Sequence, residues 1–327
     1  MSAEAKMEIG TLSVSTSPHI RSEESISKIM WSVNAALAPA ALFSVYNFGM
    51  PAVTNLLLCI ISAVFTEYLV LRWQGKDNVI CDGSAVLTGL LLAMNIPAGL
   101  PWYMPVFGSV VAIGIAKHTM GGLGYNIFNP ALIGRAFLLA SWPIAMTTWP
   151  TPASLLGKVD AVTSATPLGI MKLQGYEKLV ALFGDKMEMY KSLFIGTRGG
   201  SAGETSAVLL LLGGAYLIYK GYINWQVPVT MIATVGVLTG VFGGDPIVHM
   251  MSGGLILGAF YMATDMVTIP ITIKGQVIFA IGAGLLTVLI RLLGGYPEGV
   301  CYAILLMNCV TPLIDRLVRP KKYGARG

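Results

Sequence analysis

Residues 82–93 read Asp-Gly-Ser-Ala-Val-Leu-Thr-Gly-Leu-Leu-Leu-Ala, and residues 251–262 read Met-Ser-Gly-Gly-Leu-Ile-Leu-Gly-Ala-Phe-Tyr-Met. Each stretch lies in a short apolar segment, 83–97 or 248–268, that glycine, proline or polar residues interrupt. Each segment is followed by a full apolar segment, a Gly-Gly turn and another apolar segment. The similarity predicts two copies of one unit that contains a broken helix. A glycine-rich bundle, similar to itself in composition alone, is the simpler alternative.

The composition indicates that lipid surrounds most of this chain. Of its 327 residues, 55% are hydrophobic and 11% are charged, whereas a soluble domain carries about 25% charged residues. The net charge of +5 does not indicate a nucleic-acid partner, because basic residues gather at the C-terminus as in a cytoplasmic tail. This basic cluster consists of Arg316, Arg319, Lys321, Lys322 and Arg326.

Apolar segments long enough to cross a membrane follow one another along the chain. A hydrocarbon core of about 30 Å needs about 20 apolar residues per helix. Counting the two interrupted segments, we expect ten spans, at 29–48, 53–73, 83–97, 103–118, 129–147, 205–220, 226–243, 248–268, 275–293 and 298–316. Five spans in each copy would insert the copies with opposite orientation. The predicted fold is an all-α polytopic membrane protein of two inverted five-helix repeats with broken half-helices, in which ligand sites gather near the midplane.

The basic residues orient these spans. An even number of spans places both termini on one side, which the basic tail makes the cytoplasm. We expect the loops with Arg72, Lys76, Lys117, Lys220 and Lys274 on that side, and the long hydrophilic segment 148–204 on the outer side. The chain then divides into an N-terminal segment, a first membrane repeat, an extracytoplasmic loop, a second membrane repeat and a basic tail, at 1–28, 29–147, 148–204, 205–316 and 317–327.

No residue pattern indicates a metal or disulfide site. The cysteines (Cys59, Cys81, Cys301 and Cys309) lie far apart without a CxxC pair, and we interpret them as small buried hydrophobes. The histidines (His19, His118 and His249) are too dispersed to suggest zinc ligands.

The outer segment contains Asp-Ala-Val-Thr-Ser-Ala-Thr-Pro-Leu at residues 160–168. Pro167 disfavours helix at Thr166, so we expect a turn that exposes the Thr166 hydroxyl near the carboxylate of Asp160. An ordinary Ser/Thr turn is the alternative.

The D-x-x-T-S-A-T pattern in this loop resembles the acceptor motif of bacterial flavin transferases, which join FMN through its phosphate to a threonine hydroxyl. Along almost its whole length the chain resembles the RnfD/NqrB family of redox-pump subunits. Its short N-terminus is closer to the D subunits of Rnf complexes than to the longer B subunits. The matching stretches are Ser17-Pro-His-Ile-Arg, Asp82-Gly-Ser-Ala, Gly121-Gly-Leu-Gly-Tyr-Asn-Ile-Phe-Asn-Pro-Ala, Gly203-Glu-Thr-Ser-Ala, Phe242-Gly-Gly-Asp-Pro, Ser252-Gly-Gly, Ala263-Thr-Asp and Pro297-Glu-Gly-Val.

The resemblance implies a site and its cofactors. Thr166 would carry covalent FMN. The small side chain of Ser164 would let the loop enter the active site of the transferase, and Asp160 would help the transferase to hold the loop. Asn126 and Asn129 would hydrogen-bond a flavin ring. The family suggests riboflavin as a second, non-covalent flavin between the repeats. We assign no catalytic residue and no metal ligand.

The family also implies partners and an overall reaction. It suggests ferredoxin and NAD as the redox couple, linked to Na⁺ or H⁺ translocation. The chain has no Rossmann fingerprint and no cluster-ligating cysteine set. NAD and iron–sulfur chemistry would therefore belong to partner chains, which include a second flavoprotein subunit and iron–sulfur subunits. A flavin transferase would act during maturation.

A glycine-rich stretch, Gly-Thr-Arg-Gly-Gly-Ser-Ala-Gly, occupies residues 196–203 ahead of an expected helix. Such turns can cradle phosphate through backbone N–H groups, but Glu204 would repel an anion and no Walker lysine follows. We favour a flexible capped turn over a seat for the FMN phosphate.

Few ionisable residues lie in or near the apolar segments, and such residues usually face cavities or partners. We expect Glu67 and Asp265 to contact the coupling cation. The alternative for Asp265 is a structural cap of a half-helix or a place in a loop beside Lys274. The full set is Glu67, His118, Arg135, His249, Asp265 and Arg291.

Two other functions fit the predicted architecture. An inverted repeat with broken helices resembles the urea-transporter architecture, so a channel or small-solute transporter without a redox role is the main alternative. A structural membrane scaffold is the other. Neither has a use for the D-x-x-T-S-A-T loop.

Overall fold

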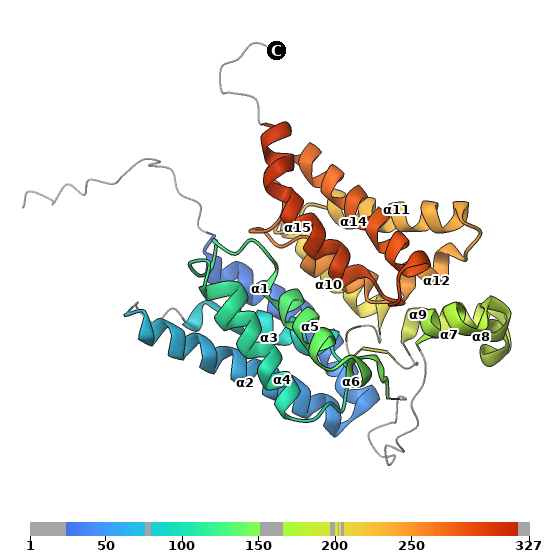
Figure 1. The fold of residues 1–327 in the computed structure, drawn as a ribbon, viewed down its shortest axis with the longest axis horizontal. Coiled ribbons are helices and arrows are strands. Elements are labelled where there is room, and N and C mark those ends of the chain that lie inside the picture. The colour runs from blue at the N-terminus through green and yellow to red at the C-terminus, as the bar shows by residue number, and fades with distance from the viewer. Residues whose placement is uncertain are drawn as a thin grey trace, which may run out of the picture.

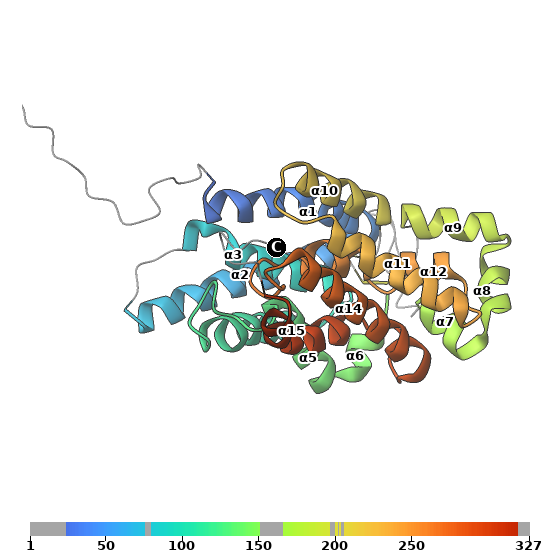
Figure 2. The ribbon, with the colours of Figure 1, turned by 90° about the horizontal axis from the view of Figure 1, so that it is seen from above.

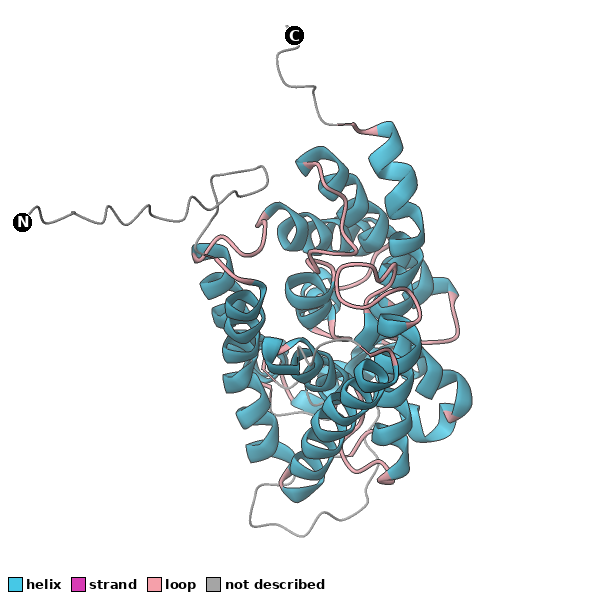
Figure 3. Ribbon diagram, turned by 90° about the vertical axis from the view of Figure 1, so that its left-hand side faces the viewer, coloured by secondary structure: helices cyan, strands magenta, loops and turns pink. Residues whose placement is uncertain are grey.

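The computed structural model of the chain describes residues 24–75, 80–150, 166–196, 200, 201, 203 and 206–319. Within these residues the chain is helical and contains no strand (Figure 3). Asp160 and Ser164 of the predicted flavin loop lie outside the described residues.

The helices of the first half begin and end at residues that suit helix termini. The Ser25 hydroxyl accepts a hydrogen bond from the Lys28 amide at 3.2 Å at the start of α1. Gly49, with φ +64°, ends α1, and Pro51 lies in the first turn of α2. The elements are α1 (Ile26–Phe48), α2 (Met50–Trp73), η1 (Ile80–Asp82), α3 (Ser84–Asn95), α4 (Tyr103–Val110), the π-helix η2 (Val111–His118), α5 (Pro130–Ser141) and α6 (Pro143–Thr147).

Three short helices follow the undescribed segment, and the second half follows them. The Thr272 hydroxyl accepts the Gly275 amide at 3.1 Å and begins α14. The elements are α7 (Pro167–Gln174), α8 (Tyr176–Phe183), α9 (Lys186–Ile195), α10 (Ala207–Tyr219), α11 (Gln226–Val241), α12 (Pro246–Met251), α13 (Leu255–Leu257), the π-helix η4 (Gly258–Met262), α14 (Ile273–Leu293) and α15 (Val300–Leu317).

The helices form two groups with a third, smaller group at one end (Figures 1 and 2). The blue-to-green helices α1–α6 lie beside the yellow-to-red helices α10–α15, and α1 packs on α10 while α5 packs on α15. The group α7–α9 lies at one end of the molecule, where it contacts α12.

Membrane-spanning character is confirmed by helix length and composition. The helices α1, α2, α14 and α15 are each long and apolar enough to cross a membrane, and α3, α5, α10 and α11 are shorter apolar helices. The predicted span 129–147 is wrong as one helix, because the chain turns at Trp142 and Pro143 restarts it as α6.

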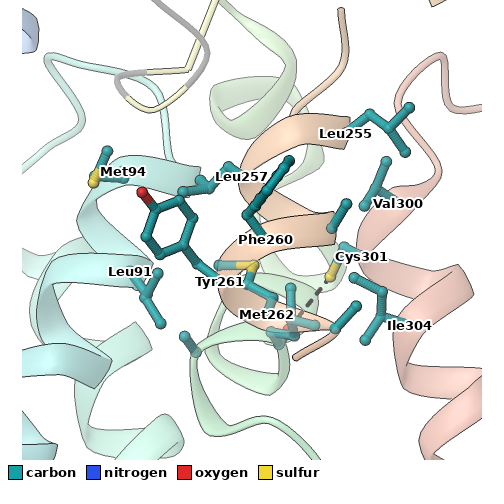
Figure 4. Close-up of a cluster of buried hydrophobic side chains, with 14 of the residues drawn as sticks. Leu91, Met94, Leu255, Leu257, Phe260, Tyr261, Met262, Val300, Cys301 and Ile304 are labelled. Atoms are coloured by element: carbon teal, nitrogen blue, oxygen red, sulfur yellow. Dashed lines mark hydrogen bonds between the residues drawn. The ribbon is translucent and has the colours of Figure 1, made fainter. Parts of the chain in front are cut away.

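A glycine with positive φ precedes a helix in both interrupted segments. Gly83, with φ +81°, is the N-cap of α3, and Gly254, with φ +66°, is the N-cap of α13. L-residues with side chains rarely adopt such positive φ values. The broken segments α3 and α13–η4 then meet in the core, where Leu91 and Met94 lie near Tyr261 and Met262 (Figure 4).

Candidate functional site

Thr166 begins α7 as its N-cap. Its hydroxyl oxygen accepts a hydrogen bond from the Gly169 amide at 3.1 Å, the usual N-cap arrangement. The side chain is only 4% exposed. Our expectation of an exposed hydroxyl is therefore wrong. Capping turns this oxygen toward the helix and away from water.

Thr166 lines a cavity of about 380 Å³, which we call the Thr166 cavity. Two charged side chains, Arg135 and Glu298, also line it. Its aromatic lining includes Trp149 and the stacked rings of Tyr296 and Tyr302, whose centroids are 6.1 Å apart. An apolar cavity with a few converging polar groups is typical of a small-molecule site.

Arg135 and Glu298 form a buried ion pair at the wall of this cavity. Arg135 lies on α5 of the first half, and Glu298 precedes α15 of the second half. The Arg135 Nη1 also donates to Asn95 Oδ1 at 3.1 Å. Its Nε is buried without a hydrogen-bond partner among the described residues. From the sequence alone, Arg135 had no assigned role and Glu298 stood out only within a matching stretch.

Asn126, Asn129 and Asp265 line a second cavity, which we call the Asn126 cavity; it is narrow, at about 90 Å³. The Asn126 Nδ2 donates to the Phe128 carbonyl at 3.1 Å, and its Oδ1 is buried with no partner in the described chain. Asn129 caps α5 by accepting the Ala131 amide at 3.1 Å. The structure thus brings Asp265 together with two residues that are far from it in sequence.

Lys117 also lines the Asn126 cavity, and it is almost fully buried. Its Nζ lies 2.5 Å from Glu67 Oε1 and 2.6 Å from Ser84 Oγ. The His118 Nε2 lies 3.2 Å from the same Glu67 oxygen. Our placement of Lys117 in a cytoplasmic loop is wrong, because the π-helix η2 continues α4 and turns this lysine inward. The cation that Glu67 contacts here is the Lys117 ammonium group.

Asp265 lies in the turn after η4, where its carboxylate has local partners. Oδ1 accepts the Val267 amide and Oδ2 accepts the Thr268 hydroxyl, both at 3.4 Å. These contacts are those of a capping side chain. Asp265 nevertheless lines the Asn126 cavity.

The glycine-rich stretch at 196–203 is described only in part. Asn47 Nδ2 donates to the Gly196 carbonyl at 3.1 Å. A Cβ added to Gly203 would lie 2.7 Å from both the Met94 carbonyl oxygen and Leu257 Cδ2. These two glycines pack against the membrane helices, and the phosphate cradle stays a prediction.

Asp245 fastens α7–α9 to the second half, a role that the sequence did not reveal. Its Oδ2 accepts the hydroxyls of Tyr176 at 2.7 Å and Tyr190 at 2.5 Å. Its Oδ1 caps α12 by accepting the amides of Ile247 and Val248. Beside this contact, Lys172 Nζ donates to the carbonyls that end α14. The group that carries Thr166 is thereby held at a fixed place.

The Asp245 contacts also set its pKa. Burial raises the pKa, but the two tyrosine hydroxyls and two backbone amides outweigh burial and hold it below the ordinary value of 3.8. A carboxyl with a lowered folded-state pKa contributes stability above its unfolded pKa and loses it as pH falls through the folded value. The attachment of α7–α9 is therefore at full strength at neutral pH.

Known proteins resemble this chain over almost its whole length. The model of the NQR2, RnfD, RnfE family matches residues 13–324. The chain is 62% identical to the D subunit of the proton-translocating ferredoxin:NAD(+) oxidoreductase complex of Clostridium ljungdahlii, over 99% of each chain. It is 49% identical to the D subunit of the Na(+)-translocating ferredoxin:NAD(+) oxidoreductase complex of Acetobacterium woodii, over 96% of this chain and 95% of the relative. It is 41% identical to the D subunit of the ion-translocating oxidoreductase complex of Stutzerimonas stutzeri, over 93% and 94%.

Replacing Asp245 should loosen α7–α9 from the second half. Hydrogen bonds to a charged group contribute about 1.5–3 kcal/mol, so Asp245→Asn should raise amide exchange in α8 and α9 by roughly tenfold or more. Hydrogen-exchange mass spectrometry of the purified protein measures this. Asp185→Asn is the matched control, because Asp185 caps α9 from an exposed position. Unchanged exchange in Asp245→Asn, or an equal rise in the control, would contradict the role of Asp245.

Proposed function

The chain belongs to the NQR2, RnfD, RnfE family, and from this premise we propose that it is the flavin-carrying membrane subunit of a redox-driven ion pump. Its relatives are named as D subunits of complexes that translocate protons, Na⁺ or unspecified ions. The proposed couple is ferredoxin to NAD. Since the named coupling ion differs between two relatives, we assign either Na⁺ or H⁺ to this chain.

The observation that carries the proposal is the place of Thr166. It stands at the wall of a 380 Å³ cavity whose lining includes the cation Arg135, and Arg135 Nε is buried with a proton to donate and no partner among the described residues. An FMN joined to Thr166 through its phosphate would add one negative charge there. A guanidinium group suits such an anion in geometry and in charge.

The other cavity residues fit the remainder of FMN. Tyr296, Tyr302 and Trp149 offer flat aromatic surfaces beside which a ring system can pack. A flavin supplies the capacity to accept and release one or two electrons, and the protein positions it and tunes its potential. Thr166 anchors the group, and Arg135, which is paired with Glu298 through Nη2, can donate to its phosphate from Nε.

We place the second, non-covalent flavin in the Asn126 cavity. Asn126 Oδ1, which has no partner in the described part of the chain, can accept a ring N–H, and Lys117 brings a buried positive charge to the lining. Riboflavin lacks a phosphate, so it needs no second anion site in the apolar interior. The cavity is narrow, so a ring would enter only if its aliphatic lining moved apart.

Coupling to the ion is proposed at Asp265 and Glu67. Asp265 lines the Asn126 cavity, and Glu67 pairs with Lys117, which also lines it. A change of charge in that cavity would alter how strongly either carboxylate holds a cation.

The proposed topology has ten crossings in two inverted repeats, with both termini in the cytoplasm. Two features support it: the broken segments of the two halves both begin at a left-handed glycine, and both contain or contact a π-helix. In this topology α7–α9 and Thr166 face the outside of the cytoplasmic membrane.

The partners in this proposal supply the chemistry that this chain lacks. A second flavoprotein subunit passes electrons to the Thr166 flavin, iron–sulfur subunits carry electrons elsewhere in the complex, and a flavin transferase attaches the FMN. The transferase must reach Thr166 before α7 is capped or after the cap opens, because the capped hydroxyl is buried. A transporter without a redox role remains the competing function, and it predicts no bound flavin.

Replacing Thr166 should remove the covalent flavin. Tryptic mass spectrometry of the native protein should show the Thr166 peptide heavier by an FMN phosphoryl adduct, and Thr166→Ala should lack it while still inserting into the membrane. Thr148→Ala is the control, because its exposed hydroxyl bonds the Ile144 carbonyl nearby at 2.7 Å. An unmodified Thr166 in an active complex would refute the assignment.

The topology predicts that α7 is reached from outside the cell. Leu173 on α7 is 82% exposed, so Leu173→Cys, in a chain without the native cysteines, should react with a membrane-impermeant thiol reagent in intact cells whose outer face is accessible. Labelling that requires lysis would reverse the topology and place the flavin on the cytoplasmic side.

Asp265→Asn should lower ion pumping in the assembled complex and leave electron transfer running, because the substitution keeps the size of the side chain and removes its charge. Ion uptake and electron transfer are measured together in proteoliposomes. Wild-type values of both would show that Asp265 is only a cap. Loss of both would place Asp265 on the redox path instead.

A further inference from the structure

A buried chain of polar contacts runs between the two cavities. At the Thr166 cavity Arg135 pairs with Glu298 through Nη2 and donates from Nη1 to Asn95 Oδ1 at 3.1 Å. The Asn95 Nδ2 lies 3.4 Å from Met262 Sδ. The Met262 carbonyl in turn accepts Asn129 Nδ2 at 3.4 Å, and Asn129 lines the Asn126 cavity. We call Arg135, Asn95, Met262 and Asn129 the connecting chain.

The connecting chain crosses the interface between the two halves at their broken segments. Asn95 is the last residue of α3, and Met262 is the last residue of η4 (Figure 4 shows Met262). Its polar members are 3–5% exposed, and Met262 is 1% exposed. Water does not screen contacts in such surroundings, so a displacement or charge at one end is felt at the next.

Arg135 is the member of the connecting chain whose hydrogen bonds an anion in the Thr166 cavity can compete for. Its guanidinium is rigid and planar. Nη1 already donates to Asn95, and Nη2 already pairs with Glu298. Nε has no partner among the described residues, although it is buried. An anion that enters the Thr166 cavity and draws Nε toward itself must turn the whole planar group. That turn carries Nη1 away from Asn95.

We propose that Arg135 is a positioning residue that couples the two cavities, so that an anion attached at Thr166 raises the affinity of the Asn126 cavity for a planar ring. Arg135 fixes the Asn95 amide at Oδ1, while Asn95 Nδ2 bonds the Leu91 carbonyl at 2.9 Å and contacts Met262 Sδ at 3.4 Å. Once Arg135 turns away, the amide can rotate, and the Met262 contact that joins the ends of α3 and η4 loosens. The Asn126 cavity is narrow, and its lining includes Leu91 of α3 and Phe260 of η4. Loosening these ends lets the lining part. This inference rests on the proposed function, because it requires both flavin sites.

A thermodynamic cycle in the purified complex tests this coupling. The four forms are the flavinylated chain and Thr166→Ala, each with Asn95 or with Asn95→Ala. The ligand is radiolabelled riboflavin, and its dissociation constant is measured by equilibrium dialysis after endogenous riboflavin is removed. Coupling between sites is roughly 5- to 150-fold in proteins. We expect riboflavin to bind at least about fivefold more tightly to the flavinylated chain when Asn95 is present.

The ratio of the riboflavin dissociation constant of Thr166→Ala to that of the flavinylated chain should fall to near one in the Asn95→Ala background. Asn34→Ala is the matched control: Asn34 is also a buried asparagine, bonded to the Gly83 carbonyl at 3.1 Å, and it lies outside the connecting chain. That variant should keep the full ratio. Arg135→Lys keeps the charge but lacks the fork that reaches Glu298 and Asn95 together, so it should also abolish the ratio, even if Asn95→Ala does not fold.

Equal riboflavin affinity with and without the Thr166 flavin would overturn the coupling. If the ratio of riboflavin dissociation constants stays unchanged in both Asn95→Ala and Arg135→Lys, the coupling does not run through Arg135. Mass spectrometry of the same samples separates these results from failure of the proposed function. If native Thr166 carries no FMN, or if no form binds riboflavin, the proposed function fails and the inference fails with it.

Discussion

The ion pair between Arg135 and Glu298 holds the two halves of this membrane protein in register. A charge in an apolar interior is stable only when it is paired and hydrogen-bonded, and removing one partner of such a pair costs about 3–5 kcal/mol. Arg135 comes from α5 and Glu298 from the loop before α15, so neither half can satisfy its own charge. The Glu298 carbonyl also accepts Arg291 Nε at 2.9 Å, which ties the pair to α14. The wall of the Thr166 cavity follows from this arrangement.

The same need to satisfy buried polar groups explains where the rest of the site lies. Helices that begin inside the protein leave backbone amides that require partners. Asn129 caps α5, Thr166 caps α7 and Asp245 caps α12. Asn129 lines the Asn126 cavity and Thr166 lines the Thr166 cavity, so these two helix starts also border the places where ligands can bind.

Much of this architecture could be predicted from the sequence. Apolar length located the helices, and the glycines at 83 and 253–254 located the breaks, because only glycine adopts those backbone angles readily. The sequence singled out Asn126, Asn129 and Asp265 separately, and the structure places all three at the lining of one cavity. Three contacts could not be predicted. Lys117 turns inward because of a π-helix that has no reliable sequence signal. The partners of Glu298 and Asp245 are 163 and up to 69 residues away, and single-sequence patterns do not specify such pairings.

We propose that Thr166 holds a flavin in the cavity that Arg135 and Glu298 border. The most direct measurement is an electron cryomicroscopy map of the native complex at a resolution that shows side chains. We expect density continuous with the Thr166 Oγ that extends into the cavity between Arg135 and the Tyr296–Tyr302 pair. A bare threonine hydroxyl, with that cavity filled by side chains or lipid while the complex is active, would contradict the claim.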